Sequence, residues 1–258
     1  AAWAEAQQAL FEPPAGLQAE LRDYQLDGYR WLMRLAHSGF GAVLADDMGL
    51  GKTVQTLALL LQRAAGGPAL VVAPTSVCGN WLLEAARFAP ELRIELYGDA
   101  LSGDEPEDEA QPAPDPARRV ARRRQVRALG PGRGLVCSYA LRQPDADIRA
   151  VVHWHNIVLD EAQAIKNPAT RRAKAALALQ GDFRLALTGT PIENRLGELW
   201  SIMGFCNPGL LGSAEQFAKN FANPIERESD PHRKAQSSRR LRRLLSPFLK
   251  RRSKSEVL

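Results

Sequence analysis

The sequence predicts an α/β fold in which a mostly parallel central sheet is covered by helices on both faces. Three observations lead to this prediction. Short apolar runs rich in valine, isoleucine and leucine alternate with helical patterns along the chain, and such runs are typical of buried parallel strands. A glycine-rich turn connects the first strand to the helix that follows it. Apolar residues make up 45% of the 258 residues, enough for a sizeable core.

Each predicted strand is a short apolar run. The strands are residues 41–45, 69–74, 92–97, 134–139, 156–161 and 183–189. Helices are predicted between them, including residues 52–65, 80–88 and 170–179, and Gly66-Gly67-Pro68 ends the first of these. Strands that alternate with helices form parallel sheets with right-handed crossovers. After Gly212 the pattern is helical and predicts no further strand.

Two charged segments interrupt the alternation. Residues 99–117 are rich in acidic residues and proline, which predicts a flexible insert with little to bury. Arg118 to Arg127 carries six arginines on a predicted short helix. The two segments could fold onto each other, but two independent solvated segments are the favoured interpretation.

The net charge of +5 is unevenly distributed. Ten lysines and arginines and no acidic residue lie between Arg233 and Lys254. The remaining 24 basic residues are outnumbered by 29 acidic ones. This local basicity indicates a tail that faces a polyanion or a partner, and a solvated helix face is an equally open interpretation.

Composition excludes several classes of protein. No apolar run approaches the roughly 20 residues of a membrane span, and the N-terminus lacks the pattern of a signal peptide. Cys78, Cys137 and Cys206 form no CxxC pair, so neither a disulfide framework nor a zinc site is expected. His153 and His155 alternate on a strand but lack further ligands, which favours a structural role. We therefore expect a cytoplasmic protein with no membrane partner.

The stretch "LADDMGLGKTVQTL", residues 44–57, is typical of a phosphate-binding loop. Glycines let backbone N–H groups surround phosphate oxygens, and the following helix directs its positive dipole end at them. Lys52 would neutralise the phosphates and Thr53 would bind Mg²⁺. The predicted nucleotide contacts are Asp47, Met48, Gly49, Leu50, Gly51, Lys52 and Thr53.

Two aspartates at this loop need an explanation. The general pattern G-x-x-x-x-G-K-[ST] has glycine where this chain has Asp46. We expect the carboxylates of Asp46 and Asp47 to point away from the phosphates. They would cap the loop, or meet Mg²⁺-bound water or a basic neighbour.

A second buried run, "NIVLDEAQAIKN", ends in Asp160 and Glu161. Asp160 would hold Mg²⁺, largely through water, and Glu161 would orient the attacking water as general base. In isolation such a pair could equally be a solvated turn or a helix cap. Its position after the glycine loop favours a nucleotide hydrolase with ATP and Mg²⁺ as cofactors. A third run ends in Thr188-Gly189-Thr190, hydroxyls that could connect the phosphate region to the opposite side of a cleft.

The chain resembles the first lobe of Swi/Snf-type ATPases, double-stranded-DNA translocases of helicase superfamily two, in their bacterial or archaeal form. The resemblance spans residues 17 to 258 and rests on ordered motifs: "LRDYQLDGYRWL", "LADDMGLGKTVQTL", "LVVAPTSVCGNWLLEAARF", "VCSYALR", "IVLDEAQAIKNPATR", "LALTGTPIENRLGELWSIMGFCNPGLLGS" and the closing "PFLKRRSKSEV". It implies a RecA-like P-loop NTPase lobe over residues 17–211. Residues 1–16 would be a linker, and residues 212–258 a helical, basic extension leading to a second lobe that this chain lacks.

The resemblance also implies roles for single residues. Gln25 matches the family's adenine-reading glutamine. Lys52, Asp160 and Glu161 match the catalytic positions, with Gln163 where the family's "DEAH" has histidine. Thr188, Gly189 and Thr190 match the motif that couples ATP state to DNA grip.

Six residues lie in or near segments that would face the DNA backbone. They are Asn80, Trp81, Ser138, Tyr139, Lys166 and Asn167. For each of them packing or helix capping is an equally open role. Trp81 in particular, like Trp31 and Trp200, sits in an apolar helical pattern that predicts core packing.

The implied function is ATP-driven translocation on duplex DNA, with a nucleoprotein or polymerase as a further partner and a nucleoid-associated location in a bacterium. Arginine fingers come from the second lobe in this family, so Arg251 and Arg252 are not expected to be fingers. The chain alone should bind nucleotide weakly and turn over slowly. Two alternatives stay open: a strand-separating DNA or RNA helicase lobe, and a non-enzymatic, nucleotide-gated interaction module.

Overall fold

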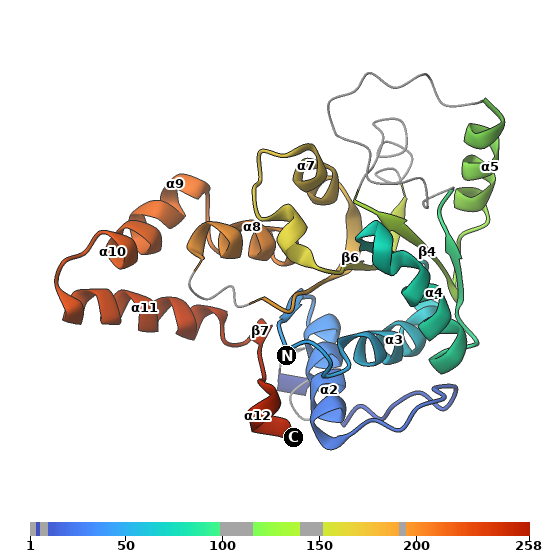
Figure 1. The fold of residues 1–258 in the computed structure, drawn as a ribbon, viewed down its shortest axis with the longest axis horizontal. Coiled ribbons are helices and arrows are strands. Elements are labelled where there is room, and N and C mark those ends of the chain that lie inside the picture. Colours follow the sequence, from blue (N-terminus) through green and yellow to red (C-terminus); the bar gives the residue numbers. More distant parts are fainter. Residues whose placement is uncertain (1–3, 6–9, 99–115, 140–151, 191–194) are drawn as a thin grey trace.

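The computed structural model describes residues 4–5, 10–98, 116–139, 152–190 and 195–258. Its centre is a seven-stranded sheet in the order β3-β4-β2-β5-β6-β1-β7, flanked by helices (Figure 1). Every strand pairing in this sheet is parallel. The predicted α/β class and the parallel sheet are confirmed.

The strands lie close to their predicted positions, with one addition at the end of the chain. They are β1 Ala42–Leu44, β2 Ala69–Ala73, β3 Arg93–Leu96, β4 Arg133–Ser138, β5 His153–Leu159, β6 Gln180–Leu187 and β7 Leu249–Lys250. All five residues of β2 are buried. Successive side chains of a strand point to opposite faces, so this central strand is covered on both faces, as its unbroken apolar run predicts.

Within the described ranges, the helices around the sheet are α2 Asp23–His37, α3 Lys52–Gln62, α4 Thr75–Phe88, α5 Pro116–Arg127, α7 Arg171–Leu177 and α8 Leu196–Cys206. The helices α2, α3 and α4 pack successively against one another, whereas α8 packs against β6 and β1. The helix predicted at residues 80–88 begins earlier, at Thr75, because Pro74 occupies the N-cap position directly after β2. The helix predicted to run to residue 65 ends at Gln62 and continues as a 3-10 turn.

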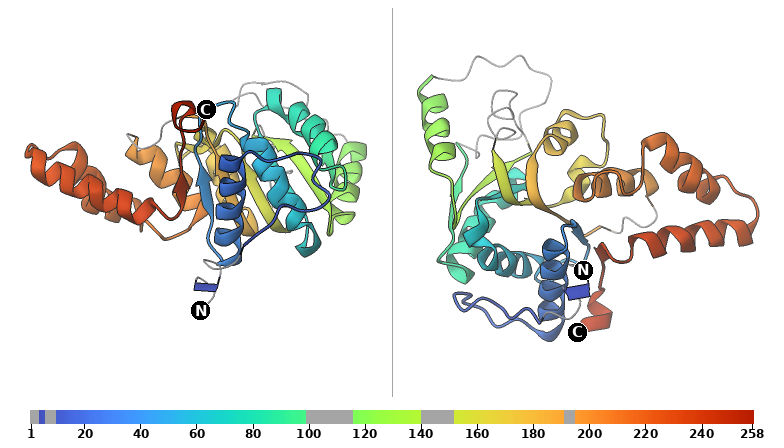
Figure 2. Two further views of the ribbon diagram at one scale, coloured as in Figure 1. Left: turned by 90° about the horizontal axis from the view of Figure 1, so that it is seen from below. Right: turned by 180° about the vertical axis from the view of Figure 1, so that it is seen from behind.

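The C-terminal helices form an arm that projects away from the sheet (Figures 1 and 2). Its elements are α9 Ala214–Phe217, a π-helical turn Ala218–Ala222, α10 Asn223–Glu226 and α11 Pro231–Leu245. The helix α11 packs along α10 and the π-helical turn. Its buried residues are Leu241 and Leu245, which leaves most of its arginines in solvent.

The prediction that no strand follows Gly212 is wrong. After the arm the chain returns to the sheet, where β7 pairs in parallel with Val43 and Leu44 of β1. The Val43 amide donates to the Phe248 carbonyl at 2.8 Å, and the Ala45 amide donates to the Lys250 carbonyl at 2.8 Å. A final helix, α12 Lys254–Val257, follows. Two residues are too few to show a strand period in a sequence. The strand is recognised only by its pairing with β1 in the structure.

The charged insert is described only in part. The arginine-rich helix exists as α5, and its Arg122 guanidinium lies 5.8 Å from the centre of the Tyr97 ring. Residues 99–115 lie outside the described residues, as does any pairing between the acidic and basic segments. Of the predicted N-terminal linker, residues 4–5 and 10–16 are described. None of the described helices is long and apolar enough to cross a membrane.

The three cysteines are buried, and His153 and His155 both contact one acidic side chain. All three cysteines are free and buried, and burial raises the pKa of the Cys78 thiol to about 11 and that of Cys206 to about 12. His153 Nε2 and His155 Nδ1 each contact one oxygen of Asp182, at 2.6 and 2.8 Å. Across the described part of the chain, no group of three or more histidines, cysteines and acidic residues is arranged to hold a metal ion.

Candidate functional site

Three adjacent strands deliver the predicted motifs to one edge of the sheet. The phosphate loop follows β1, Asp160 and Glu161 follow β5, and Thr188 follows β6, while β6 lies between β5 and β1. Because all three strands are parallel, their carboxyl ends meet at the same edge. This edge is where ligands bind in open α/β sheets.

The loop between β1 and α3 has the backbone that a phosphate cradle requires. Gly49 and Gly51 have φ angles of +87° and +80°, a left-handed conformation that glycine adopts without steric cost. A Cβ atom on Gly51 would lie 2.4 Å from Gln25 Nε2, so a side chain there would also displace the Gln25 amide. The helix α3 begins at Lys52, which places its N–H groups and positive dipole end at the loop.

Lys52 lies at the centre of the converging motifs. Its Nζ donates to the carbonyl oxygens of Asp46 at 2.6 Å and Asp47 at 3.3 Å. Burial lowers the pKa of Lys52, and the negative charges of Asp46, Glu161, Asp160 and Asp47 oppose that shift. A Cβ atom on Gly189 would lie 3.9 Å from Nζ. The loop, the acidic pair and the Thr188-Gly189-Thr190 turn therefore face a common space.

Gln25 ties the beginning of α2 to the loop. Its Nε2 donates to the Leu50 carbonyl at 3.2 Å, and its Oε1 accepts from the Arg22 amide at 3.0 Å. Tyr24 Oη donates to the same Leu50 carbonyl at 3.0 Å. Gln25 thus lies beside the nucleotide loop with both ends of its amide engaged, and its contact with adenine stays a prediction.

The aspartates of the loop face the C-terminal segment of the chain. The Asp46 side chain is fully buried. The Arg252 guanidinium donates to both of its carboxylate oxygens, from Nε at 3.1 Å and from Nη2 at 2.6 Å. Asp47 Oδ2 accepts from the Lys254 amide at 3.1 Å. The sequence suggested a basic neighbour but did not identify Arg252. The burial of Asp46, which only the structure shows, explains the pairing, because a buried charge is costly unless it is paired.

Asp160 is held by groups on three sides. Trp81 Nε1 donates to its Oδ2 at 2.8 Å, and the Glu161 amide donates to its Oδ1 at 2.8 Å. Tyr139 Oη donates to its carbonyl at 2.7 Å. Burial raises the pKa of Asp160, although the Trp81 and Glu161 hydrogen bonds act in the opposite direction. The arrangement fixes the carboxylate's orientation at the strand end.

The residues proposed to face DNA divide into two groups. Trp81, Ser138 and Tyr139 are buried, with exposures of 1%, 6% and 6%, so their side chains present almost no surface to a ligand. Trp81 and Tyr139 instead orient Asp160, in line with the apolar pattern around Trp81. The remaining three, Asn80, Lys166 and Asn167, are exposed, and their contact with DNA stays a prediction.

Glu161 occupies an unusual backbone conformation. Its φ of +47° is the only positive value among the non-glycine residues that the structure describes. Such conformations are uncommon for residues with a Cβ atom and cluster at functional sites. Gln163 Nε2 donates to Glu161 Oε2 at 2.6 Å, and Gln163 Oε1 accepts from Thr188 Oγ1 at 3.1 Å. Thr188 Oγ1 in turn lies 3.1 Å from Thr190 Oγ1.

The donor atoms at this edge fit magnesium bound together with a nucleotide. Mg²⁺ prefers oxygen ligands, keeps several waters, and uses one or two protein groups plus phosphates. Thr53 is the second residue of α3 and supplies a hydroxyl oxygen. Asp160 supplies a carboxylate whose oxygens each accept one hydrogen bond from the protein. A carboxylate oxygen has a second lone pair, so both oxygens retain the capacity to accept from Mg²⁺-bound water.

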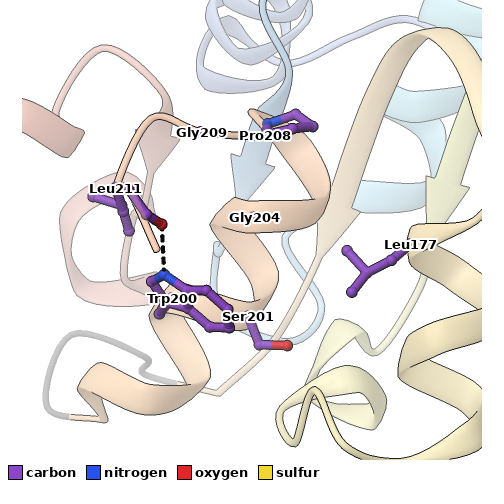
Figure 3. Close-up of a pocket in the computed structure, with 8 residues that line it drawn as sticks. Leu177, Trp200, Ser201, Gly204, Pro208, Gly209 and Leu211 are labelled. Carbon is purple, nitrogen blue, oxygen red and sulfur yellow. Dashed lines mark hydrogen bonds between the residues drawn. The ribbon is translucent and has the colours of Figure 1, made fainter. Parts of the chain in front are cut away.

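A separate small pocket lies between α7 and α8 (Figure 3). Its volume is about 170 Å³, and its lining residues are Leu177, Trp200, Ser201, Gly204, Pro208, Gly209, Leu211 and Gly212. Trp200 closes one side by donating from Nε1 to the Gly212 carbonyl at 3.1 Å. Trp200 is partly buried against the core, as is Trp31. None of the residues predicted to bind phosphate lines this pocket, which is distinct from the candidate site.

Comparisons with known proteins agree with this geometry. Residues 24–258 match the family model of the SNF2-related domain. The Bacillus subtilis protein YwqA, a candidate ATP-dependent helicase/translocase, is 43% identical over 241 residues, which are 92% of this chain and 24% of YwqA. The chromatin-remodeling ATPase INO80 of Cryptococcus neoformans is 39% identical over 253 residues, 95% of this chain and 14% of INO80. The chain thus spans about a quarter or less of these relatives.

Solved structures give the same result. The SWI2/SNF2 ATPase core of Sulfolobus solfataricus in complex with double-stranded DNA matches with a TM-score of 0.77 and 37% identity. The match covers 97% of this chain and 49% of that core. This chain belongs to the SNF2-related domain family, and its parallel sheet with flanking helices is the RecA-like fold of the SWI2/SNF2 ATPase core.

Proposed function

We propose that this chain is the first, ATP-binding lobe of an ATP-dependent translocase on double-stranded DNA. One observation carries the proposal: a glycine loop with Lys52, an Asp160-Glu161 pair and a Thr188-Gly189-Thr190 turn meet at the carboxyl edge of three adjacent parallel strands. Each motif alone is common. Their meeting around one partly buried lysine amine is the arrangement that nucleotide hydrolysis requires.

The residues take distinct roles in this proposal. The loop amides and Lys52 bind the phosphates, for which Lys52 exchanges its hydrogen bonds to the carbonyls of Asp46 and Asp47. Thr53 and Asp160 hold Mg²⁺, which when bound neutralises the charge that develops on the phosphates. Glu161 orients the attacking water and accepts its proton. Gln163 holds the Glu161 carboxylate and links it to Thr188.

The proposed DNA contacts are sequence-independent. Asn80, Lys166 and Asn167 are exposed polar side chains, suited to phosphate and sugar oxygens. Backbone contacts supply affinity and position but little sequence information. The Sulfolobus core with double-stranded DNA supports duplex DNA as the partner.

A second lobe of the same polypeptide completes the proposed machine. The chain covers 49% of the Sulfolobus ATPase core, which is the share expected of one lobe out of two. An arginine finger contributes about 10³- to 10⁵-fold in rate in phosphoryl transfer. Neither Arg252, which is committed to Asp46, nor the neighbouring Arg251 is assigned that role. We therefore expect nucleotide binding and very slow turnover from the chain alone.

The experiment is an ATPase assay on the chain extended through its second lobe, with duplex DNA, single-stranded DNA or RNA. We expect the largest stimulation by duplex DNA, loss of nucleotide binding in Lys52→Ala, and retained binding without turnover in Glu161→Gln. Preference for RNA or a single strand would favour a strand-separating helicase. Unchanged cellular function of Glu161→Gln would favour a non-enzymatic interaction module, and robust turnover by the 258-residue chain alone would contradict the requirement for a second lobe.

A further inference from the structure

Arg252 brings together three segments that are far apart in the sequence. Its Nε and Nη2 bind the Asp46 carboxylate at 3.1 and 2.6 Å, and Nη2 also donates to Gln55 Oε1 at 3.1 Å. Its Nη1 donates to the Tyr24 carbonyl, and its guanidinium lies 5.4 Å from the centre of the Tyr24 ring. The start of α2, the phosphate loop with α3, and the segment after β7 therefore meet at one side chain.

Asp46 accepts hydrogen bonds through both its side-chain carboxylate and its backbone carbonyl. Its carboxylate binds Arg252, and its carbonyl oxygen accepts from Lys52 Nζ at 2.6 Å. The side chain has no exposed surface. Asp46 therefore connects the amine that faces the phosphates with the guanidinium of the C-terminal segment, through a single residue.

The backbone repeats the connection. The Asp47 amide donates to the Arg252 carbonyl at 3.0 Å, and the Lys254 amide donates to Asp47 Oδ2 at 3.1 Å. Together with the β1–β7 pairing, these bonds join the chain from Val43 to Asp47 with the chain from Phe248 to Lys254. A change in the orientation of the Asp46-Asp47 peptide would thus alter contacts of the C-terminal segment.

The helix α2 has a glycine where Gln55 and Arg252 approach it. A Cβ atom on Gly28 would lie 2.0 Å from Gln55 Oε1 and 2.7 Å from Arg252 Nη2. Gly28 is a helical residue, where glycine normally costs stability relative to alanine. The close approach of Gln55 and Arg252 gives a physical reason for glycine at this position.

We propose that Arg252 is a positioning residue for the phosphate loop, and that it couples nucleotide binding at Lys52 to the segment Leu249–Val257. The proposal rests on the proposed function and extends it to a route by which the site communicates with the chain beyond the sheet. Nucleotide draws Lys52 Nζ from the Asp46 carbonyl toward phosphate. Because Arg252 holds the Asp46 carboxylate, the Asp46-Asp47 peptide can reorient only to a limited extent. That reorientation alters the hydrogen bonds of Asp47 to the Arg252 carbonyl and the Lys254 amide. Coupling of this kind is reciprocal, so loss of the Arg252 contacts weakens nucleotide binding.

The experiment measures ADP·Mg²⁺ binding to the 258-residue chain by calorimetry, and amide hydrogen exchange across residues 249–257 with and without ADP. Arg252→Met removes the guanidinium, and Arg252→Lys keeps the charge but cannot bind both Asp46 oxygens. Arg251→Met is the matched control, because Arg251 is the exposed neighbour. Lys52→Ala reports on the nucleotide site itself.

We expect ADP to slow exchange of the Lys254 amide in the wild type and in Arg251→Met. In Arg252→Met this slowing is lost and Kd rises about fivefold or more, and Arg252→Lys gives an intermediate rise. If Arg252→Met does not fold, Arg252→Lys and the double variant Asp46→Asn/Arg252→Met, which leaves no unpaired buried charge, decide the matter by the same readouts. A folded Arg252 variant with wild-type Kd and wild-type slowing of exchange overturns the inference. Equal ADP binding by the wild type and Lys52→Ala would instead overturn the proposed function.

Discussion

Gln163 joins Glu161 to Thr188 through the two ends of one amide. Its NH₂ group donates to the Glu161 carboxylate at 2.6 Å, and its carbonyl oxygen accepts from the Thr188 hydroxyl at 3.1 Å. Thr188 is fully buried, while Glu161 sits in a left-handed conformation at the end of β5. The proposed general base and the proposed coupling turn are therefore one hydrogen-bonded unit.

Replacing Gln163 should slow turnover without weakening nucleotide binding. Gln163→Ala frees the Glu161 carboxylate, and we expect kcat to fall about tenfold or more, because small misplacements of a catalytic group are costly. KM for ATP should change less than about twofold, because Gln163 has no assigned contact with nucleotide. Steady-state ATPase kinetics of the two-lobed protein with duplex DNA measure both, and Gln236→Ala on exposed α11 is the control. A rise in KM at constant kcat would contradict the positioning role.

The folded protein should be more stable with an amide than with a carboxylate at position 160. Burial raises its pKa above the ordinary 3.8, so the folded state binds this proton more tightly than the unfolded state. The free energy of unfolding consequently falls as the pH rises from about 3.8 through the raised pKa, and the deficit persists at neutral pH. Asp160→Asn should raise Tm at neutral pH and abolish turnover. Thermal unfolding at several pH values tests this, with exposed Glu20→Gln as the control. A lower Tm for Asp160→Asn at neutral pH would show that its hydrogen bonds outweigh its desolvation.

Sequence patterns were sufficient for the parts of the fold that repeat. The strand β2 is an unbroken apolar run and β5 ends in one, and the alternation of such strands with helices implies a parallel sheet. The convergence of Lys52 with Asp160 follows from one geometric rule, because motifs at the carboxyl ends of parallel strands share an edge. The α/β class and the meeting of the motifs could therefore be predicted.

The specific partners of buried polar groups could not be predicted in this way. Arg252 is 206 residues from Asp46, and periodicity assigns a residue to a face but names no partner. Trp81 lies beside an exposed asparagine in the same helix, and only the fold shows that its indole turns inward to Asp160. The positive φ of Glu161 has no glycine or asparagine to signal it. These features depend on how distant segments dock, which single-sequence patterns do not contain.

As the pH rises, nucleotide binding should begin to weaken at a lower pH than it would if Lys52 had the pKa of an ordinary lysine. Burial lowers the pKa of Lys52 from 10.5, so its ammonium loses a proton sooner as the pH rises, and a neutral amine attracts phosphate less. We expect the Kd for ADP·Mg²⁺ to increase as the pH rises through this lowered pKa, at a pH below the 10.5 of an ordinary lysine, while the charge on ADP is constant. Lys52→Arg retains its charge over this range and should show a flat profile relative to its own value at neutral pH. Parallel profiles for the two proteins would assign the effect to another group.

DNA binding should depend on salt in proportion to the number of phosphates contacted. For B-DNA the slope of log K against log salt is about −0.9 for each phosphate neutralised. Lys166→Ala removes one exposed cation from the segment that follows β5 and the Asp160-Glu161 pair. It should reduce the slope by about one. Arg93→Ala removes the same charge at the beginning of β3, an edge strand three positions from β5 in the sheet, and should leave the slope unchanged. Equal effects of the two variants would indicate a response to net charge alone.

The same measurement decides the role of the basic arm. Arg242 and Arg243 are exposed on α11, whose buried side is formed by Leu241 and Leu245, so replacing both arginines by alanine leaves the packing of the arm intact. If α11 faces the DNA backbone, the double variant reduces the salt slope by about two. We expect this result, because the segment from Arg233 to Lys254 contains no acidic residue and both arginines are exposed to solvent. An unchanged slope would identify α11 as a solvated helix face, and a loss of affinity restricted to one base sequence would contradict recognition through the phosphate backbone.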